Sequence, residues 1–227
     1  MRTLCVLLIL AALGGAVVDA EGIPPTRYRP LPVPGYILTL VLQDDTGAPI
    51  DARVSVLDVA TGTCYGPVDP HEPVYESWSG HNYFHARDRV EVVVAAGDVR
   101  ILIAKGPEYS VFDRTITVAR DMTYSARIRR LVDAAWYGWY GGDTHVHIAH
   151  GGLGAAYDID NVHMAMIARA EDLRVTCVLT NGPYFNGGLD PAGDSRHLIH
   201  YGMEHRSPLY GHLGLLGMKS LTPAACC

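Results

Sequence analysis

Residues 36–58 read YILTLVLQDDTGAPIDARVSVLD. The runs 36–42 and 52–58 are rich in residues that favour strands, and the second alternates between apolar and polar positions. Between them, Asp44-Asp-Thr-Gly47 and Pro49 are typical turn residues. This stretch therefore predicts a strand, a turn and a second strand.

Four more runs of the same kind follow along the chain. They cover residues 89–94, 98–104, 114–118 and 122–128, most of them alternate with period two, and no convincing helical pattern separates them. Short strands at this spacing are typical of a sandwich of two antiparallel sheets. The pattern predicts a β-sandwich domain over residues 36–131.

The N-terminal segment predicts export. Met1-Arg2 is a short basic start, residues 4–18 are almost wholly apolar, and Val18-Asp19-Ala20 fits a small-residue cleavage site. An apolar run of about 15 residues is shorter than the roughly 20 that span a bilayer. We expect a signal peptide over residues 1–20, a secreted or periplasmic mature chain without a membrane segment, and a Pro-rich linker over residues 21–35 with five prolines.

After Leu131 the pattern changes. Residues 160–172 have helical periodicity with Asp160 as the N-cap, and residues 174–179 form an apolar run typical of a buried strand. A strand, loop, helix and strand in this order begin a series that builds parallel sheets. Residues 132–227 are therefore predicted to be an α/β domain.

Composition excludes several function classes. The formal net charge of −6 and the pI near 6.0 argue against nucleic acid as a partner. Cys64 and Cys177 stand alone, so they indicate no disulfide framework. The chain has no Gly-x-Ser-x-Gly motif and no phosphate-binding Gly-Lys-Ser/Thr loop, which leaves serine hydrolases and P-loop proteins without support.

Histidine is concentrated near the C-terminus, where eight of the eleven lie in the last 83 residues. The sharpest pattern is Asp143-Thr-His145-Val-His147. On a strand, residues two apart point to the same face about 7 Å apart, so two imidazoles can converge on one cation. Asp143 is expected on that face, where it orients a histidine or takes part directly. A pair of structural or surface histidines is the alternative.

Later donors fit the same site. Glu204, and then His212, are predicted to end successive strands, which would place an oxygen and a nitrogen donor at the same rim of the sheet as His145 and His147. A mixed set of this kind suits Zn, Mn or Fe. His150 could reach the site from its loop, His163 is expected on the helix, and the roles of His197, His200 and His205 stay open.

These residues resemble a known family. Gly142-Asp-Thr-His-Val-His147, Ala170-Glu-Asp-Leu173, Gly202-Met-Glu204 and Gly211-His212 look like the CehA/McbA-type metallohydrolases of the polymerase-and-histidinol-phosphatase (PHP) superfamily. Residues 47–54 and 96–109 look like the carboxypeptidase-regulatory-type sandwich that precedes such catalytic domains. The resemblance covers most of the mature chain.

The resemblance implies a partial (β/α)₇ barrel and a metal-dependent hydrolase of small-molecule esters, carbamates or phosphoesters. By matching position it makes His145, His147, Glu204 and His212 the metal ligands, with a metal-activated water as the nucleophile. Asn181 stands where the superfamily often carries an Asp-His pair, and it would be a weaker oxygen ligand or a substrate contact.

The chain stops at Cys227, before the later strands of such a barrel. We therefore expect a C-terminally truncated fragment with weak or no activity. The alternative is an exported, non-catalytic binding protein that has a β-sandwich module and a vestigial metal site.

Overall fold

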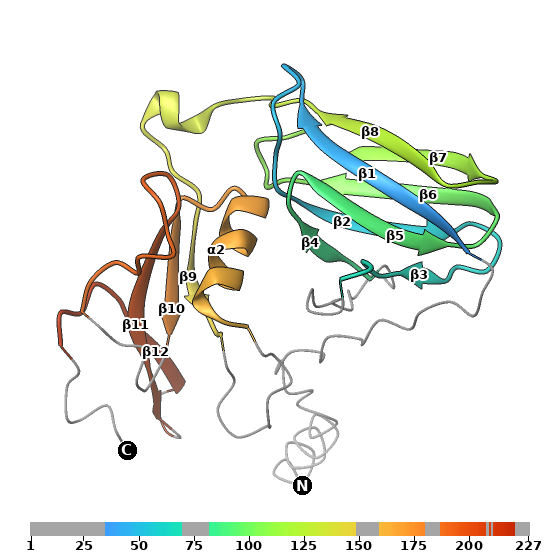
Figure 1. Cartoon of the computed structure of the whole chain (residues 1–227). Coiled ribbons are helices and arrows are strands. Elements are labelled where there is room, and N and C mark those ends of the chain that lie inside the picture. The colour runs from blue at the N-terminus through green and yellow to red at the C-terminus, as the bar shows by residue number, and fades with distance from the viewer. Residues whose placement is uncertain are drawn as a thin grey trace, which may run out of the picture.

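The computed structural model describes residues 35–69, 82–148, 159–179, 187–207, 209 and 211–220. Figure 1 shows two packed sheets on one side and a smaller sheet with a helix on the other. Cys226 and Cys227, the expected signal peptide and most of the linker lie outside the described residues. Within them, no helix is long and apolar enough to cross a membrane.

The first part of the chain is a two-sheet sandwich, which is compatible with that part of the expected fold. One sheet has the order β5-β1-β8, and the other has the order β3-β2-β6-β7 with β4 paired to β2. β1 and β8 pair in parallel and the other neighbours pair antiparallel. The strands are β1 (Tyr36–Asp44), β2 (Ala52–Asp58), β3 (Cys64–Tyr65), β4 (Phe84–Ala86), β5 (Arg89–Val94), β6 (Gly97–Ala104), β7 (Phe112–Val118) and β8 (Met122–Ile128).

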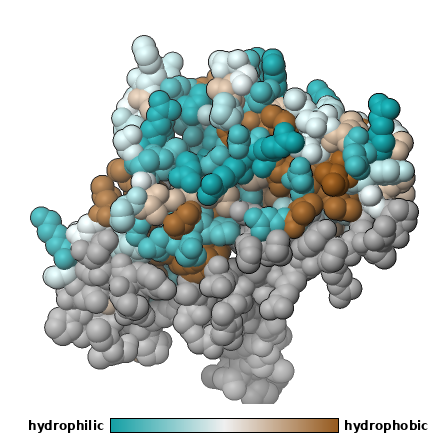
Figure 2. All heavy atoms as spheres, in the orientation of Figure 1, coloured by the Kyte–Doolittle hydropathy of each residue, from teal (hydrophilic) through white to brown (hydrophobic). Residues whose placement is uncertain are grey.

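Period-two alternation builds the core of the sandwich. Leu38, Leu40 and Leu42 of β1 are fully buried, as are Ile101 of β6 and Phe84 of β4. Burying a large apolar side chain contributes about 1.5–3 kcal/mol. Figure 2 shows that in this view the hydrophobic residues left at the surface form separate patches.

The second part is a four-stranded sheet with the order β12-β11-β10-β9. β9 and β11 both run parallel to β10, whereas β12 pairs antiparallel with β11. Its elements are the 3₁₀ turn η1 (Ala134–Tyr137), β9 (Gly142–Val146), α2 (Asn161–Ala170), β10 (Val175–Leu179), β11 (Leu198–Ser207) and β12 (Gly211–Leu215). The Asp160 side chain accepts the backbone N–H of His163, which confirms the predicted N-cap.

The predicted (β/α)₇ barrel is wrong. Such a barrel needs parallel strands with a helix after each, but α2 is the only α-helix among the described residues. After β11 the chain turns back at Leu209 and returns as β12, its antiparallel neighbour. Because of this reversal, the second sheet contains both parallel and antiparallel neighbours and does not close into a barrel.

Helix α2 covers one face of the second sheet. Met164 and Ala168 of α2 pack against Val178 of β10 and against Ile199 and Tyr201 of β11. On its other side the helix contacts β2 and β4, so it lies between the second sheet and the sandwich (Figure 1). The opposite face of the second sheet carries the side chains of the candidate metal centre.

The sandwich holds the C-terminal end of α2. The buried ammonium group of Lys105 donates to the backbone carbonyls of Asp51 and Arg169, and the Arg169 guanidinium lies 3.1 Å from the Asp51 carboxylate. A cation at a helix C-terminus is stabilising because it faces the unpaired carbonyls. Burial lowers the pKa of Lys105.

A second contact joins the sandwich to the residue after the helix. Oε1 of Glu171 lies 2.7 Å from Nε of Arg53 and 2.7 Å from Nε2 of His85. Burial by itself would raise the pKa of Glu171, but hydrogen bonds from His85 and Arg53 lower it from 4.5 to about 2. The position of α2, and of the sheet beneath it, therefore depends on charged contacts with the sandwich.

Candidate metal centre

β9 and the residue after it place two histidines on the face of the second sheet opposite α2. Val146 pairs with Val178 of β10 and packs toward α2. Its neighbours His145 and His147 therefore point away from the helix, because successive side chains on an extended backbone alternate between faces. The Nε2 atoms of the two imidazoles lie 3.1 Å apart, and a shared cation between them stays a prediction.

β11 brings Glu204 to the same face. Tyr201 packs toward α2, so the positions of Gly202 and Glu204 alternate to the open side. Glu204 is 4% exposed even though it carries a carboxylate. Gly202 is needed beside it, because a Cβ there would lie 2.6 Å from the backbone oxygen of Leu215 and 3.0 Å from the Leu179 side chain.

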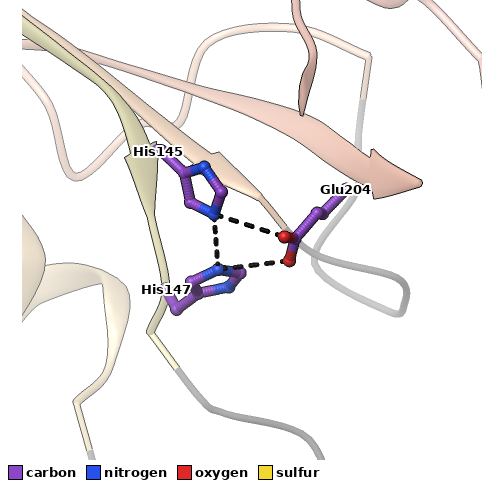
Figure 3. A group of neighbouring side chains, drawn as sticks. All are labelled: His145, His147 and Glu204. Carbon is purple, nitrogen blue, oxygen red and sulfur yellow. Dashed lines mark hydrogen bonds and ion pairs between the residues drawn. The ribbon is translucent and has the colours of Figure 1, made fainter. Parts of the chain in front are cut away.

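The three side chains meet in one cluster, which Figure 3 shows. Nε2 of His145 lies 3.4 Å from Oε1 of Glu204, and Nε2 of His147 lies 3.3 Å from Oε2. Around an ion bound at about 2.0–2.1 Å, ligand atoms are about 3.3 Å apart in a tetrahedron and about 3.0 Å apart in an octahedron. The observed separations of 3.1–3.4 Å, which run to the two different oxygens of Glu204, are close to these values.

Burial makes a cation favourable at this cluster. A carboxylate removed from water is costly unless a positive charge or hydrogen bonds compensate it. The side chain of Glu204 is 3% exposed, that of His147 is 15% exposed and that of His145 is 50% exposed. One side of the cluster thus stays open to solvent.

His212 joins the cluster through Glu204. Its Nδ1 lies 2.6 Å from Oε1 of Glu204, and its side chain is 55% exposed. The three side chains with mutually close donor atoms are His145, His147 and Glu204. His212 therefore lies where it holds and orients the carboxylate. It begins β12 rather than ending a strand, and the antiparallel pairing of β11 and β12 brings it near Glu204.

Asp143 has a backbone role in the structure. Its Oδ1 accepts the backbone N–H of His145 at 2.9 Å. Asp143 pairs with Thr176 and Val146 with Val178, so the register shifts by one residue between them. The shift interrupts the simple alternation that predicted Asp143 on the face of His145. The carboxylate of Asp143 thus contacts the backbone of β9 at His145.

The remaining candidate residues lie elsewhere. Asn181 and His150 are outside the described residues. His163 is partly buried on α2, and Nδ1 of His197 lies 3.1 Å from the Asp194 carboxylate. His200 and His205 are partly buried on β11. The structure places none of the described ones among the three clustered donors.

Comparisons with known proteins do not support the hydrolase family. No family model matches the chain, and no curated protein matches it. A crystal structure of a DUF3823 family protein from Bacteroides ovatus ATCC 8483 is similar at 15% identity, with a TM-score of 0.27. The match covers 42% of this chain and 44% of that chain, so less than half of either chain is covered.

The resemblance to CehA/McbA-type hydrolases of the PHP superfamily is therefore corrected. The short motifs that suggested it occur here on an open mixed sheet, and no family model extends them. Two histidines one residue apart on a strand, and a Glu on a neighbouring strand, are local features that different folds can share. The DUF3823 neighbour, at its low TM-score, indicates neither a shared fold nor a shared function.

Proposed function

We propose that this chain is an exported, non-catalytic binding protein whose second sheet holds one divalent transition-metal ion at His145, His147 and Glu204. The observation that carries the proposal is the set of three donor-atom separations of 3.1–3.4 Å around a buried carboxylate. The expectation of export rests on the N-terminal sequence.

The donor chemistry favours a metal over a simple ion pair. Two imidazole nitrogens 3.1 Å apart repel each other if both rings are protonated, and the other group beside the buried carboxylate is the more exposed ring of His212. A divalent cation satisfies both nitrogen lone pairs and the carboxylate together. Mixed nitrogen and oxygen donors suit Zn, Mn or Fe.

The cavities lined by described residues lie away from the cluster. Sites that process small molecules are usually concave pockets. Two cavities lined by described residues are in the sandwich: one of about 740 Å³ beside β4 and β5 and a small one beside β2 and β6. Neither is lined by His145, His147 or Glu204.

The proposal predicts one bound metal per chain that depends on the two histidines. After EDTA treatment and reloading, elemental analysis and titration calorimetry with Zn²⁺ or Mn²⁺ should show about one site. His145→Ala with His147→Ala should abolish it, and Glu204→Gln should weaken it by at least about 100-fold, because a charged ligand is lost. His197→Ala is the matched control, since that ring lies beside Asp194 and outside the cluster.

Two results would overturn the proposal. Equal metal content in the wild type and the double histidine variant would remove the site. Metal-dependent cleavage of an aryl ester, carbamate or phosphoester, lost in the double variant, would contradict the non-catalytic part.

A further inference from the structure

An exposed aromatic segment lies between the two parts of the molecule. Trp136, Tyr137, Trp139 and Tyr140 are 85%, 72%, 74% and 65% exposed. They belong to Trp-Tyr-Gly-Trp-Tyr-Gly, a tandem repeat over residues 136–141. Figure 1 shows their turn (yellow-green, upper left) on the path from β8 to β9, apart from both sheets. We call residues 136–140 the aromatic platform.

The backbone of the platform is fixed although its rings are not covered. Asp133 caps η1 by accepting the N–H of Ala135, and Gly138 ends it in the left-handed region at φ 80°. The N–H groups of Gly138 and Trp139 return to the carbonyls of Ala135 and Ala134 at 3.0 Å each, which is the Schellman pattern. A preorganised surface loses little conformational entropy when a partner covers it.

The sandwich also anchors the start of the platform. Oε2 of Glu108 accepts the N–H of Ala134 at 3.2 Å and lies 3.0 Å from Nη1 of Arg130. The same Arg130 nitrogen lies 3.3 Å from Asp133. Side chains from the sandwich therefore hold the turn in one orientation.

The platform leads directly into an open sheet edge. β9 pairs with β10 on one side, and no described strand pairs with its other edge. Residues 142–145 of β9 are exposed, and Val146 is partly exposed. An edge strand presents unpaired backbone donors and acceptors, which are a template for pairing with another chain. The aromatic platform and the β9 edge form one continuous exposed stretch from residue 136 to residue 146.

The area of this stretch suits a dimer. Covered aromatic side chains bury roughly 150–250 Å² each, so four rings at the observed exposures offer on the order of 600 Å². Leu131 and Val132, 57% and 45% exposed, lie just before them. A stable interface of standard size buries about 800 Å² per partner. The platform with its neighbours and the β9 edge reaches that size.

We propose that a second copy of this chain covers the aromatic platform and the β9 edge in a twofold-symmetric dimer. A symmetric interface must be self-complementary. From residue 131 to residue 146 the acidic residues are Asp133, which lies beside Arg130, and Asp143, whose carboxylate accepts the N–H of His145, so two copies meet there with few unpaired charges. Tryptophan donates hydrogen bonds and tyrosine donates and accepts them, and their rings pack edge to face.

Other occupants fit the platform less well. The segment from 131 to 142 has no Lys or Arg, and the chain carries a formal charge of −6, which disfavours a nucleic acid or an anionic membrane. A neutral glycan or a neutral lipid surface would contact the rings but would leave the backbone groups of the β9 edge uncovered.

Sedimentation of the full chain between about 1 and 100 µM, in EDTA, tests this proposal. The wild type should be dimeric, and Trp136→Ser with Trp139→Ser should weaken the dimer by at least about 100-fold, because exposed tryptophans covered at an interface are its usual hot spots. Val59→Ser with Val111→Ser, which removes two exposed apolar side chains from the sandwich, should leave the dimer unchanged.

A second variant tests the strand edge. Thr144→Lys, with circular dichroism unchanged, should weaken the dimer about tenfold because it puts like charges face to face on paired edges. Several outcomes would overturn the dimer: a monomeric wild type at 100 µM, dimerisation that persists in the double tryptophan variant, or a dimer seen only without EDTA. Binding of a monomeric wild type to phosphatidylcholine vesicles or dextran would assign the platform to another occupant. Loss of the metal site does not affect the comparison of the variants, because all of these samples contain EDTA.

Discussion

The sandwich and the second sheet differ in how their faces are covered. The sandwich packs two sheets face to face around a cluster of 17 buried apolar residues, whereas the cluster beneath α2 has seven. The second sheet is covered by α2 on one face, and its other face carries His145, His147 and Glu204. Among the described residues, the sandwich therefore has the larger apolar core, and the three donors lie on the face of the second sheet opposite α2.

The largest effect on stability is expected in the core of the sandwich. Phe84→Ala empties a fully buried site in the sandwich core and should lower the free energy of unfolding by about 3–5 kcal/mol. Because the sandwich holds the end of α2 through Asp51 and Lys105, metal binding should be lost together with the sandwich fold. Urea unfolding with and without Zn²⁺ measures both.

A matched change at the surface of the sandwich is the control. Val111 is 66% exposed, so Val111→Ala should change stability by no more than about 0.5 kcal/mol. Metal binding that survives intact in an unfolded Phe84→Ala chain would show that the second sheet does not depend on the sandwich.

The next effect lies at the contact between the two parts. The pKa of Glu171 is lowered from 4.5 to about 2 by His85 and Arg53 against the opposing effect of burial. A carboxyl group with a lowered pKa contributes its full stability above pH 4.5, and the contribution declines as the pH falls from 4.5 to about 2. A shift of this size corresponds to about 2–3 kcal/mol after allowance for the partly exposed Arg53.

Glu171→Gln removes that charge and should reduce the stability at pH 7 by about 2 kcal/mol. The difference between the two proteins should shrink as the pH is lowered through this window, as measured by urea unfolding at pH 7, 5, 4 and 3. Asp113→Asn, which breaks an exposed ion pair with Arg100, should show little change at any of these pH values. A constant difference between the wild type and Glu171→Gln at all four pH values would rule out the ionised contact.

Local patterns predicted much of this structure. The run at 52–58 coincides with β2, and Asp160 caps α2, because alternation and capping depend on residues close in sequence. The pairing of His145 with His147 was expected for a similar reason, since the side chains of a strand alternate faces wherever the strand lies. Glu204 was expected from its place at the end of a later strand and from the family resemblance.

Long-range features were not predictable in the same way. Arg53 and Glu171 are separated by 118 positions, and the residues around each of them do not predict which residue it contacts. The topology after β10 was predicted wrongly, because residues 198–215 form an antiparallel hairpin and the local sequence does not choose between a hairpin and a parallel crossover. The repeat at 136–141 alternates large rings with glycine, and in the structure it forms an exposed 3₁₀ turn.

The smallest effect on stability is expected at the N-terminal end of α2, in the second part of the molecule. The Asp160 side chain accepts the N–H of His163 at 2.7 Å at the start of α2, so Asp160→Ala should cost about 1 kcal/mol. Asp160→Asn, which keeps an acceptor oxygen, should cost less and serves as the control. Asp51 and Arg53 of the sandwich bind Arg169 and Glu171 at the C-terminal end of α2, whereas Asp160 lies at its N-terminal end. Hydrogen exchange should therefore quicken in α2 and β10 while β1 and β6 stay protected, because local opening is confined to the less covered part. Equal acceleration in both parts would mean that they unfold as one unit and that the difference in cover has no thermodynamic consequence.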